Sequence, residues 1–297
     1  MELIDSHCHL DAPEFDADRP AVMAAARAAG VAGIVVPAYV AARWHELLTL
    51  CRAHAVASSP GLPVLWPALG LHPVHLAAHD DADVGVLADA LAAHADVVAV
   101  GEIGLDRFLP ELTAPAAWAR QVRLFEAQLA LAKQHDLPVI VHARRCHADI
   151  MACLKRVGHR SGGILHAFSG SVEEARQYRR LGLHLGLGGP LTYPQANRLR
   201  AVAQALPADA FVIETDAPDL IPHPQHAHHA DGRPRQPGER VRNSPAYLPS
   251  VLATFAELRG EAPEVLAAQF WQNTVTALRL PSVMASPGVT ASATAIS

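Results

Sequence analysis

Short apolar runs bounded by turn-forming residues recur along the chain, and segments with helical spacing separate them. Most of these runs are continuously apolar rather than alternating, which is typical of parallel strands that are covered on both faces. Strands are expected at residues 3–7, 33–38, 64–71, 97–102, 137–142, 162–167, 184–188 and 211–216. The pattern therefore predicts a parallel sheet built from a repeated strand–helix unit.

Helical spacing of apolar residues is found in the segments between these runs. Helices are predicted at residues 17–29, 42–57, 84–95, 116–135, 172–181 and 194–206, and a helical C-terminal part runs from Pro245 to about residue 280. Eight strands alternating with helices predict a fold of the α/β class, a (β/α)8 TIM barrel that forms a single domain over residues 1–281. A doubly wound open parallel sheet is the alternative.

Two segments fall outside this alternation. Residues 218–243 are polar and rich in proline, and a loop of that length is expected to be a lid or an arm that contacts substrate. Within it, residues 222–236 are rich in histidine, at positions whose spacing defines no metal site, so we expect these side chains to be solvated. Residues 282–297 are small and without pattern, which predicts a disordered tail.

Composition narrows the possible functions. The 297 residues are 51% hydrophobic and carry a formal net charge of -5, which excludes a protein that holds nucleic acid on a broad basic surface. A nucleic-acid substrate therefore has to be held at a local site. Aromatic residues make up only 5%, which argues against a stacking platform for long single strands. No apolar run reaches the ~18 residues of a membrane helix, and an N-terminus containing Glu2 and Asp5 does not resemble a signal peptide. We therefore expect no membrane association, a cytoplasmic location and four reduced cysteines.

Ionisable side chains end several of the predicted strands. His7 and His9 follow the first strand two residues apart, so they face the same side of an extended chain. The other strand ends carry Glu102, His142, His166 and Asp216. A barrel brings all of these ends to one face, and burying such groups without partners costs free energy. Four imidazoles and two carboxylates would then surround one point, as ligands for divalent metal ions.

The number of ligands indicates how many ions are bound. Six ligands are too many for one tetrahedral catalytic ion that keeps an open position. They suit two divalent ions about 3.5–4 Å apart, a separation used for in-line attack at phosphorus. The expected cofactor is therefore a pair of divalent ions.

Seven short motifs carry a resemblance to a known family. They are DSHCHL at 5–10, ALGLHP at 68–73, GEIGLD at 101–106, PVIVHAR at 138–144, HAFSG at 166–170, ETDAP at 214–218 and RNSP at 242–245. In this order they resemble the TatD-type metal-dependent deoxyribonucleases, a branch of the amidohydrolase-like barrels. The resemblance covers residues 5–245 and implies hydrolysis of DNA phosphodiesters with divalent metal.

The resemblance also implies a role for each ligand. The ligands of the first ion would be His7 and His9, those of the second His142 and His166, and the bridge between the ions Glu102. Asp216 would bind the first ion, orient the nucleophilic water and accept its proton, so Asp216 and Glu102 are the catalytic candidates. No lysine follows Glu102 nearby, which favours the nuclease branch over phosphotriesterase-like barrels, where a modified lysine often forms the bridge.

Three further residues are candidate substrate-binding groups. His72 either donates a hydrogen bond to a substrate phosphate or caps a turn. Arg144 follows His142 by two residues and suits a bidentate contact to phosphate, or forms an ion pair at the rim. Asp106 either contacts substrate or supports the ligands.

Function is left with one leading interpretation and one alternative enzyme class. The leading interpretation is an exonuclease-like hydrolase that cleaves DNA or a short oligonucleotide at strand ends, as a monomer or small homo-oligomer. The alternative is an amidohydrolase-like deaminase or lactonase acting on a small metabolite, because the same ions can activate water toward carbon. A non-catalytic metal-binding protein fits a complete ligand set less well. The sequence leaves open the choice among zinc, manganese and magnesium, and the choice between DNA and RNA.

Overall fold

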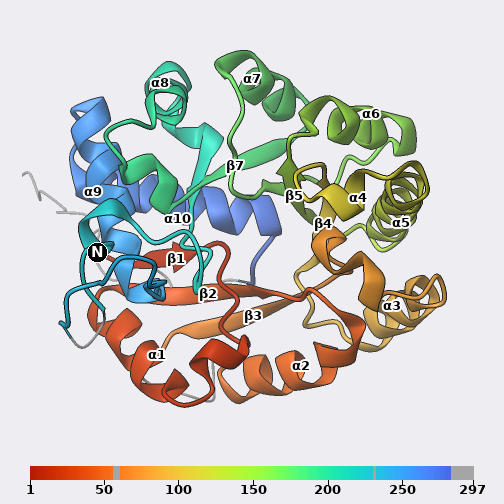
Figure 1. Cartoon of the computed structure of the whole chain (residues 1–297), viewed down its shortest axis with the longest axis horizontal. Helices are drawn as coiled ribbons and strands as arrows, with labels where there is room; N and C mark the ends of the chain where they lie inside the picture. Colours follow the sequence, from red (N-terminus) through yellow and green to blue (C-terminus); the bar gives the residue numbers. More distant parts are fainter. Residues whose placement is uncertain (56–60, 230–231, 282–297) are drawn as a thin grey trace, which may run out of the picture.

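The computed structural model describes residues 1–55, 61–229 and 232–281. Eight parallel strands pair in the order in which they occur along the chain, and helices surround them (Figure 1). The strands are β1 (Leu3–Asp5), β2 (Val31–Pro37), β3 (Val64–Leu69), β4 (Ala99–Asp106), β5 (Val139–Arg144), β6 (Gly163–Leu165), β7 (Leu183–Leu187) and β8 (Phe211–Ile213). All eight predicted strands are present, with shifted ends.

The first and last strands meet at a seam that nearly closes the sheet. The N–H of Ser6 donates to the carbonyl oxygen of Ile213 at 3.1 Å, and the N–H of Asp216 donates to that of His7 at 2.9 Å. A doubly wound sheet would reverse its strand order at a switch point, whereas here each strand pairs with the next one. The predicted (β/α)8 barrel is thus confirmed, and the open-sheet alternative is wrong.

Helices cover the outside of the barrel and include those that the sequence predicts. They are α1 (Arg19–Ala28), α2 (Trp44–Ala53), α3 (Asp83–Ala93), α4 (Pro110–Thr113), α5 (Pro115–Gln134), α6 (His147–Val157), α7 (Val172–Arg180), α8 (Asn197–Ala205), α9 (Leu248–Arg259) and α10 (Pro263–Leu278). Short 3-10 helices are η1 (Pro13–Phe15), η2 (Ala41–Arg43), η3 (Pro73–Ala78), η4 (Gly189–Thr192), η5 (Ala208–Ala210), η6 (His223–Gln225) and η7 (Pro245–Tyr247). Helix α6 was not predicted, although Ile150, Met151 and Leu154 bury one of its faces at helical spacing.

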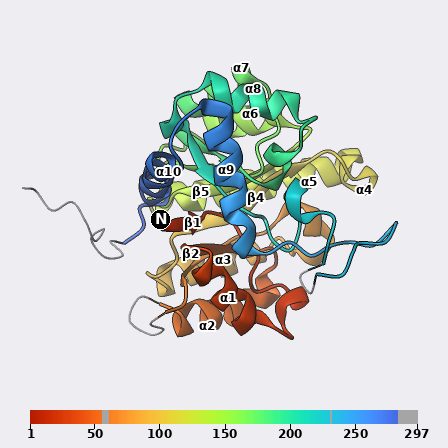
Figure 2. The same cartoon turned by 90° about the vertical axis from the view of Figure 1, so that its left-hand side faces the viewer.

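The interior of the barrel is a packed apolar core. It contains Ile4, Val35, Trp66, Ala68, Ala99, Ile140, Ile164 and Val212, and the C-terminal end of α10 packs against it through Ala277 and Leu278. Gly33 leaves room for the indole of Trp66, because a Cβ atom at Gly33 would lie 2.3 Å from that ring. Helix α10 lies at the end of the barrel where β1 begins (Figure 2). The candidate functional groups lie at the opposite end of the barrel, where the strands finish.

The segment after β8 extends from that opposite end (Figure 2). Asn243 ties the segment to the barrel, since its Nδ2 donates to the carbonyl oxygens of Thr215 at 2.8 Å and Asp219 at 2.6 Å. Its histidines include His226, which contacts Arg235, and His229, whose Nε2 lies 2.9 Å from Glu239. Among the described residues, no histidine of this segment belongs to a group of side chains that could hold a metal ion.

Two expectations concern the ends and the location of the chain. The predicted tail, residues 282–297, lies outside the described residues, and the domain bounds of 1–281 stay a prediction. Within the described ranges, no helix combines the length and the apolar composition needed to cross a membrane.

Candidate metal centre

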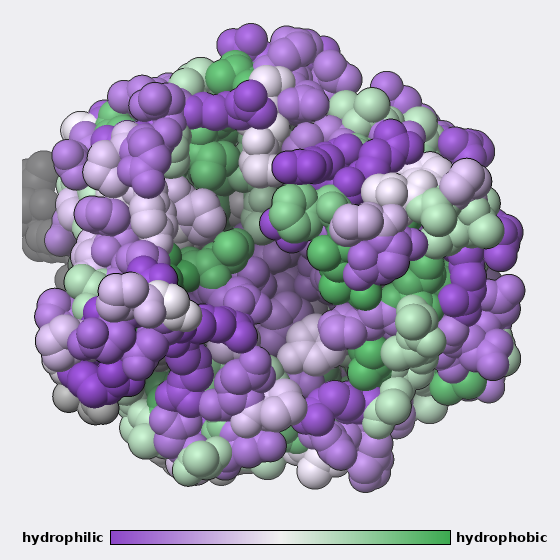
Figure 3. Space-filling view, in the orientation of Figure 1, coloured by the Kyte–Doolittle hydropathy of each residue, from purple (hydrophilic) through white to green (hydrophobic). Residues whose placement is uncertain are grey.

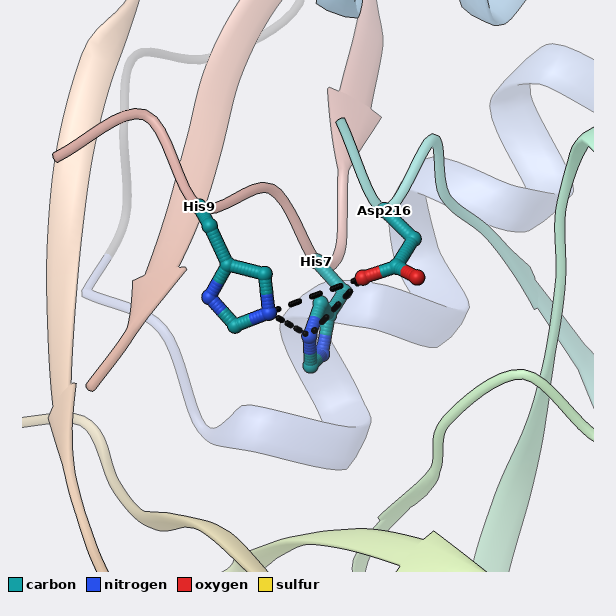
Figure 4. A group of neighbouring side chains, drawn as sticks. All are labelled: His7, His9 and Asp216. Atoms are coloured by element: carbon teal, nitrogen blue, oxygen red, sulfur yellow. Dashed lines mark hydrogen bonds and ion pairs between the residues drawn. The ribbon is translucent and has the colours of Figure 1, made fainter. Parts of the chain in front are cut away.

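The segments after β1 and β8 bring three predicted ligands to one point at the mouth of the barrel (Figure 4). The Nε2 atoms of His7 and His9 lie 3.2 Å apart. Asp216 Oδ1 lies 3.6 Å from His7 Nε2 and 3.5 Å from His9 Nε2. The side chain of His7 is fully buried, and those of His9 and Asp216 are 11% and 15% exposed. The group therefore sits at the floor of the mouth with limited access to solvent.

Glu102, near the middle of β4, completes this group with one of its oxygens. Its Oε2 lies 3.1 Å from His7 Nε2 and 3.4 Å from His9 Nε2. Ligand atoms about 2.0–2.1 Å from a tetrahedral zinc ion lie about 3.3–3.4 Å from one another. The five spacings that join His7 or His9 to the other ligand atoms, from 3.1 to 3.6 Å, are close to that value. The donor set thus fits a bound divalent ion.

The other oxygen of Glu102 faces a second group of imidazoles. Glu102 Oε1 lies 3.1 Å from His142 Nδ1 and 3.0 Å from His72 Nε2. His166 Nε2 lies 3.9 Å from the same oxygen and 3.6 Å from Asp216 Oδ1, between the two groups. One carboxylate therefore faces both clusters, as a bridging ligand would.

Hydrogen bonds to the outer ring nitrogens identify which imidazoles offer a lone pair to a metal. His9 Nδ1 lies 3.1 Å from the carbonyl oxygen of Pro37, which can only accept, so Nδ1 carries the proton and Nε2 is free to bind. For His166 the outer nitrogen Nδ1 lies 3.0 Å from Glu214 Oε1 in an ion-pair contact, and the charge of that carboxylate favours the proton on Nδ1, which leaves Nε2 to bind.

The same reasoning separates His142 from His72. His142 Nε2 lies 2.9 Å from Asp106 Oδ2, which places the proton on Nε2 and leaves the Nδ1 lone pair directed toward Glu102, where it could bind a metal. In His72 the proton lies toward the cavity centre instead, because its outer nitrogen Nδ1 accepts the backbone N–H of Val74 at 3.1 Å. In neutral His72 the proton is then on Nε2, which makes this nitrogen a hydrogen-bond donor rather than a ligand.

The electrostatics of the site favour a positive charge at the point where these ligands meet. Burial opposes protonation of His9 and His166, but nearby carboxylates raise the pKa of His9 to about 9 and that of His166 to about 10. Burial likewise opposes ionisation of Glu102, but the surrounding imidazoles hold its pKa well below the usual range. Burial and the neighbouring His166 lower the pKa of His7, and burial raises the pKa of Asp216 to about 6. A divalent ion would supply the positive charge that these carboxylates attract.

The predicted substrate contacts differ in their access to the mouth. Asp106 is fully buried; one of its oxygens meets His142, and the other accepts the N–H of Phe108 at 2.7 Å. Asp106 is therefore placed to support a ligand, and a contact between Asp106 and substrate stays a prediction. Arg144 is exposed and lines the cavity, and His72 lines it as well.

A cavity of about 600 Å³ opens above the ligands. Its wall includes Tyr39, His75, Phe168, Leu187 and Leu220 in addition to the ligands. Figure 3 shows the corresponding hollow near the middle of this face, with hydrophobic residues on two of its sides. A cavity of this size admits one or two nucleotides rather than a folded macromolecule.

Glu214 is the functional residue for which the sequence suggested no role. It accepts the N–H of Ala167 at 2.6 Å and orients His166. The spacing rule that groups His7 with His9 could have identified it, since Glu214 precedes Asp216 by two residues. Gly186 makes room for it, because a Cβ atom at Gly186 would lie 2.2 Å from Glu214 Oε2.

Comparisons with known proteins agree with this site. The model of the family described as TatD related DNase matches residues 4–279. The chain is 39% identical over 279 residues to the protein named uncharacterized metal-dependent hydrolase YjjV from Escherichia coli (strain K12), covering 94% of this chain and 98% of the relative. It is 34% identical over 280 residues to a protein named 3'-5' ssDNA/RNA exonuclease TatD from Pantoea vagans (strain C9-1), covering 94% of this chain and 100% of the relative.

A solved structure extends the agreement to three dimensions. The crystal structure of YJJV, a TatD homolog from Escherichia coli K12, matches this fold with a TM-score of 0.81 and 38% identity, covering 94% of this chain and 98% of that one. Because the family model and these relatives span nearly all of the described barrel, the chain belongs to the TatD related DNase family of metal-dependent hydrolases.

Proposed function

We propose that this protein is a metal-dependent nuclease that hydrolyses phosphodiester bonds at the ends of DNA strands. The observation that carries the proposal is the division of Glu102 between two clusters: Oε2 faces His7, and Oε1 faces His142, at 3.1 Å in each case. A carboxylate that faces two ligand groups suits a pair of divalent ions, and such pairs act at phosphorus.

The ligands divide between two ions in the proposed centre. The first ion would be held by His7, His9 and Asp216, the second by His142 and His166, and both by Glu102. Zinc, manganese and magnesium are the candidate metals, since imidazole and carboxylate ligands admit all three. When bound, such ions supply Lewis acidity that activates water and offsets the charge of the phosphoryl oxygens.

The remaining steps belong to side chains of the chain itself. Asp216 lies on the wall of the cavity, where its carboxylate can orient a water molecule and accept its proton. The guanidinium of Arg144 is a donor on the same wall, which suits contacts with the non-bridging oxygens of a phosphodiester. His72 lines this wall too, with its Nε2 N–H directed at Glu102 Oε1, 3.0 Å away.

The relatives support a more specific substrate. The relative from Pantoea vagans carries the name of a 3'-5' exonuclease for single-stranded DNA and RNA. We extend to this chain the preference for single strands and for 3' ends. A cytoplasmic location and a monomeric or small homo-oligomeric state stay predictions from the sequence.

The deciding experiment compares substrates after metal removal and reconstitution. Protein treated with a chelator is loaded with zinc, manganese or magnesium and incubated with end-labelled single-stranded DNA, duplex DNA, and a panel of lactones and amides. We expect metal-loaded protein to shorten the single strand from the end opposite its label. Metal-free protein and Asp216→Asn protein should not shorten it. Turnover confined to the lactones or amides would instead establish the deaminase or lactonase alternative.

A further inference from the structure

An exposed aromatic ring lies beside the catalytic cavity, on the loop after β4. Phe108 is 39% exposed, and it is the one aromatic residue among the large hydrophobic side chains that are exposed in the described part of the chain. The guanidinium carbon of Arg144, which lines the cavity, lies 3.5 Å from the centre of the Phe108 ring, and that of Arg145 lies 4.7 Å from it. An exposed ring with a cation stacked on it is a combination that binds nucleobases and phosphates together.

The position of Phe108 is fixed relative to the metal ligands. Its N–H donates to Asp106 Oδ1 at 2.7 Å, while Asp106 Oδ2 lies 2.9 Å from His142 Nε2. The pairing of β4 with β5 continues one residue past the end of β4, since the N–H of Arg107 donates to the carbonyl oxygen of Arg144, the last residue of β5, at 2.9 Å. The backbone of Phe108 is therefore hydrogen-bonded to the same carboxylate that orients a ligand, which fixes the residue relative to the metal centre.

A second exposed apolar side chain lies across the mouth. Leu220 lines the cavity, is 38% exposed and has a φ of 49°, in the left-handed region that residues other than glycine avoid. It follows β8, whereas Phe108 follows β4, and strands four places apart in an eight-stranded barrel lie on opposite sides. Backbone strain together with apolar exposure is unfavourable for folding alone, and strain of this kind clusters at binding sites.

We propose that Phe108 stacks on the nucleobase next to the scissile phosphate, with Leu220 contacting the strand from the opposite rim. This inference rests on the proposed nuclease function and adds to it a base-binding position that the metal centre does not provide. Arg144 would place the phosphate beside the stacked base. A base that is paired in a duplex cannot lie against the ring, so the position selects unpaired strand ends.

The first test compares an ordinary single-stranded oligonucleotide with one whose terminal nucleotides are abasic. Phe108→Ala should raise KM for the ordinary strand about tenfold and leave KM for the abasic strand unchanged. Phe108→Trp should restore the wild-type KM, because a larger ring stacks at least as well. Val86→Ala, at an exposed valine on α3, is the matched control and should change neither KM.

If Phe108→Ala changed KM equally for the ordinary and the abasic strand, or changed KM for neither, the stacking role would be overturned. Melting temperatures of all variants exclude loss of fold as the cause, and small changes are expected because the ring is partly exposed.

A binding measurement keeps this inference separate from the proposed function. Asp216→Asn protein is titrated with a strand that carries 2-aminopurine at its 3' end, whose fluorescence falls when the base stacks. In this Asp216→Asn background, we expect the fluorescence to be quenched when Phe108 is retained and when the protein carries Phe108→Trp. With Phe108→Ala the quenching should be at least fivefold weaker. Identical responses would reject stacking even if wild-type protein cleaves the strand. Quenching without any cleavage by wild-type protein would reject the nuclease function and retain the binding site.

Discussion

Glu214 Oε1 lies 3.0 Å from Nδ1 of His166 and also accepts the backbone N–H of Ala167 at 2.6 Å. The carboxylate thereby holds the imidazole so that its Nε2 is directed toward Asp216, 3.6 Å away. Outer carboxylates that orient a ligating histidine raise its basicity and fix its tautomer. Glu214 is thus a positioning residue for the metal centre, although it touches neither proposed ion.

Replacing Glu214 by glutamine should weaken metal binding while preserving the fold. The amide retains the size of the side chain but removes the charge that stabilises the proton on His166 Nδ1. We expect about 10- to 100-fold lower metal affinity, measured by competition with a chromophoric chelator. Glu173→Gln, at an exposed glutamate on α7, is the control. Unchanged affinity in Glu214→Gln protein would show that the hydrogen bond to Ala167 is the residue's main role.

Asp216→Asn should abolish turnover and leave the barrel folded. An amide cannot accept the proton of the attacking water, and loss of such a base costs about 10²- to 10⁴-fold in rate. The measurement is kcat on a single-stranded oligonucleotide, with metal content determined in parallel because Asp216 is also a proposed ligand. Normal activity at normal metal content would contradict the role assigned to Asp216.

The sequence predicted the strands well because their apolar runs are continuous and end in ionisable residues. It predicted the ends of the strands less well. Strands β1, β6 and β8 stop at Asp5, Leu165 and Ile213, so the ligands that follow them lie beyond the ends of the strands. Ala167 and Asp216 have positive φ values of 42° and 55°, a conformation that hydrophobic patterning does not reveal in residues other than glycine.

Contacts between neighbouring strands were the part of the site that could not be predicted. Asp106 reaches His142 because β4 and β5 pair in a particular register, with Gly104 opposite His142 and an irregularity between Val100 and Ile103. Patterning gives the face of each residue but not its partner on the next strand. For that reason the sequence left Asp106 between a substrate contact and a supporting role.

His72→Ala should preserve the metal content and weaken substrate binding. Its Nδ1 accepts the N–H of Val74, and burial lowers its pKa to about 4, so the neutral ring donates its Nε2 N–H to Glu102 Oε1 at 3.0 Å rather than offering a lone pair to a metal. We expect KM for oligonucleotides to rise up to roughly tenfold, because loss of one hydrogen bond to a charged group leaves the Glu102 carboxylate free to face the phosphate of the substrate. His142→Ala is the comparison and should lose metal, since its Nδ1 lone pair faces Glu102. Equal metal loss in the two variants would make His72 a ligand.

The stability of the metal-free protein should fall in mild acid because of His184, a half-buried residue of β7. Burial and the nearby Arg179 lower the pKa of His184 to about 4, below the value of about 6.5 in an unfolded chain. The unfolded state therefore binds the extra proton between these values, and the free energy of unfolding decreases as the pH falls from about 6.5 toward 4. Between pH 7 and pH 5, wild-type protein should lose up to about 2 kcal/mol more than His184→Gln protein. Urea unfolding at both pH values, with chelator present so that metal release does not contribute, measures this difference; parallel losses would assign the acid sensitivity to other groups.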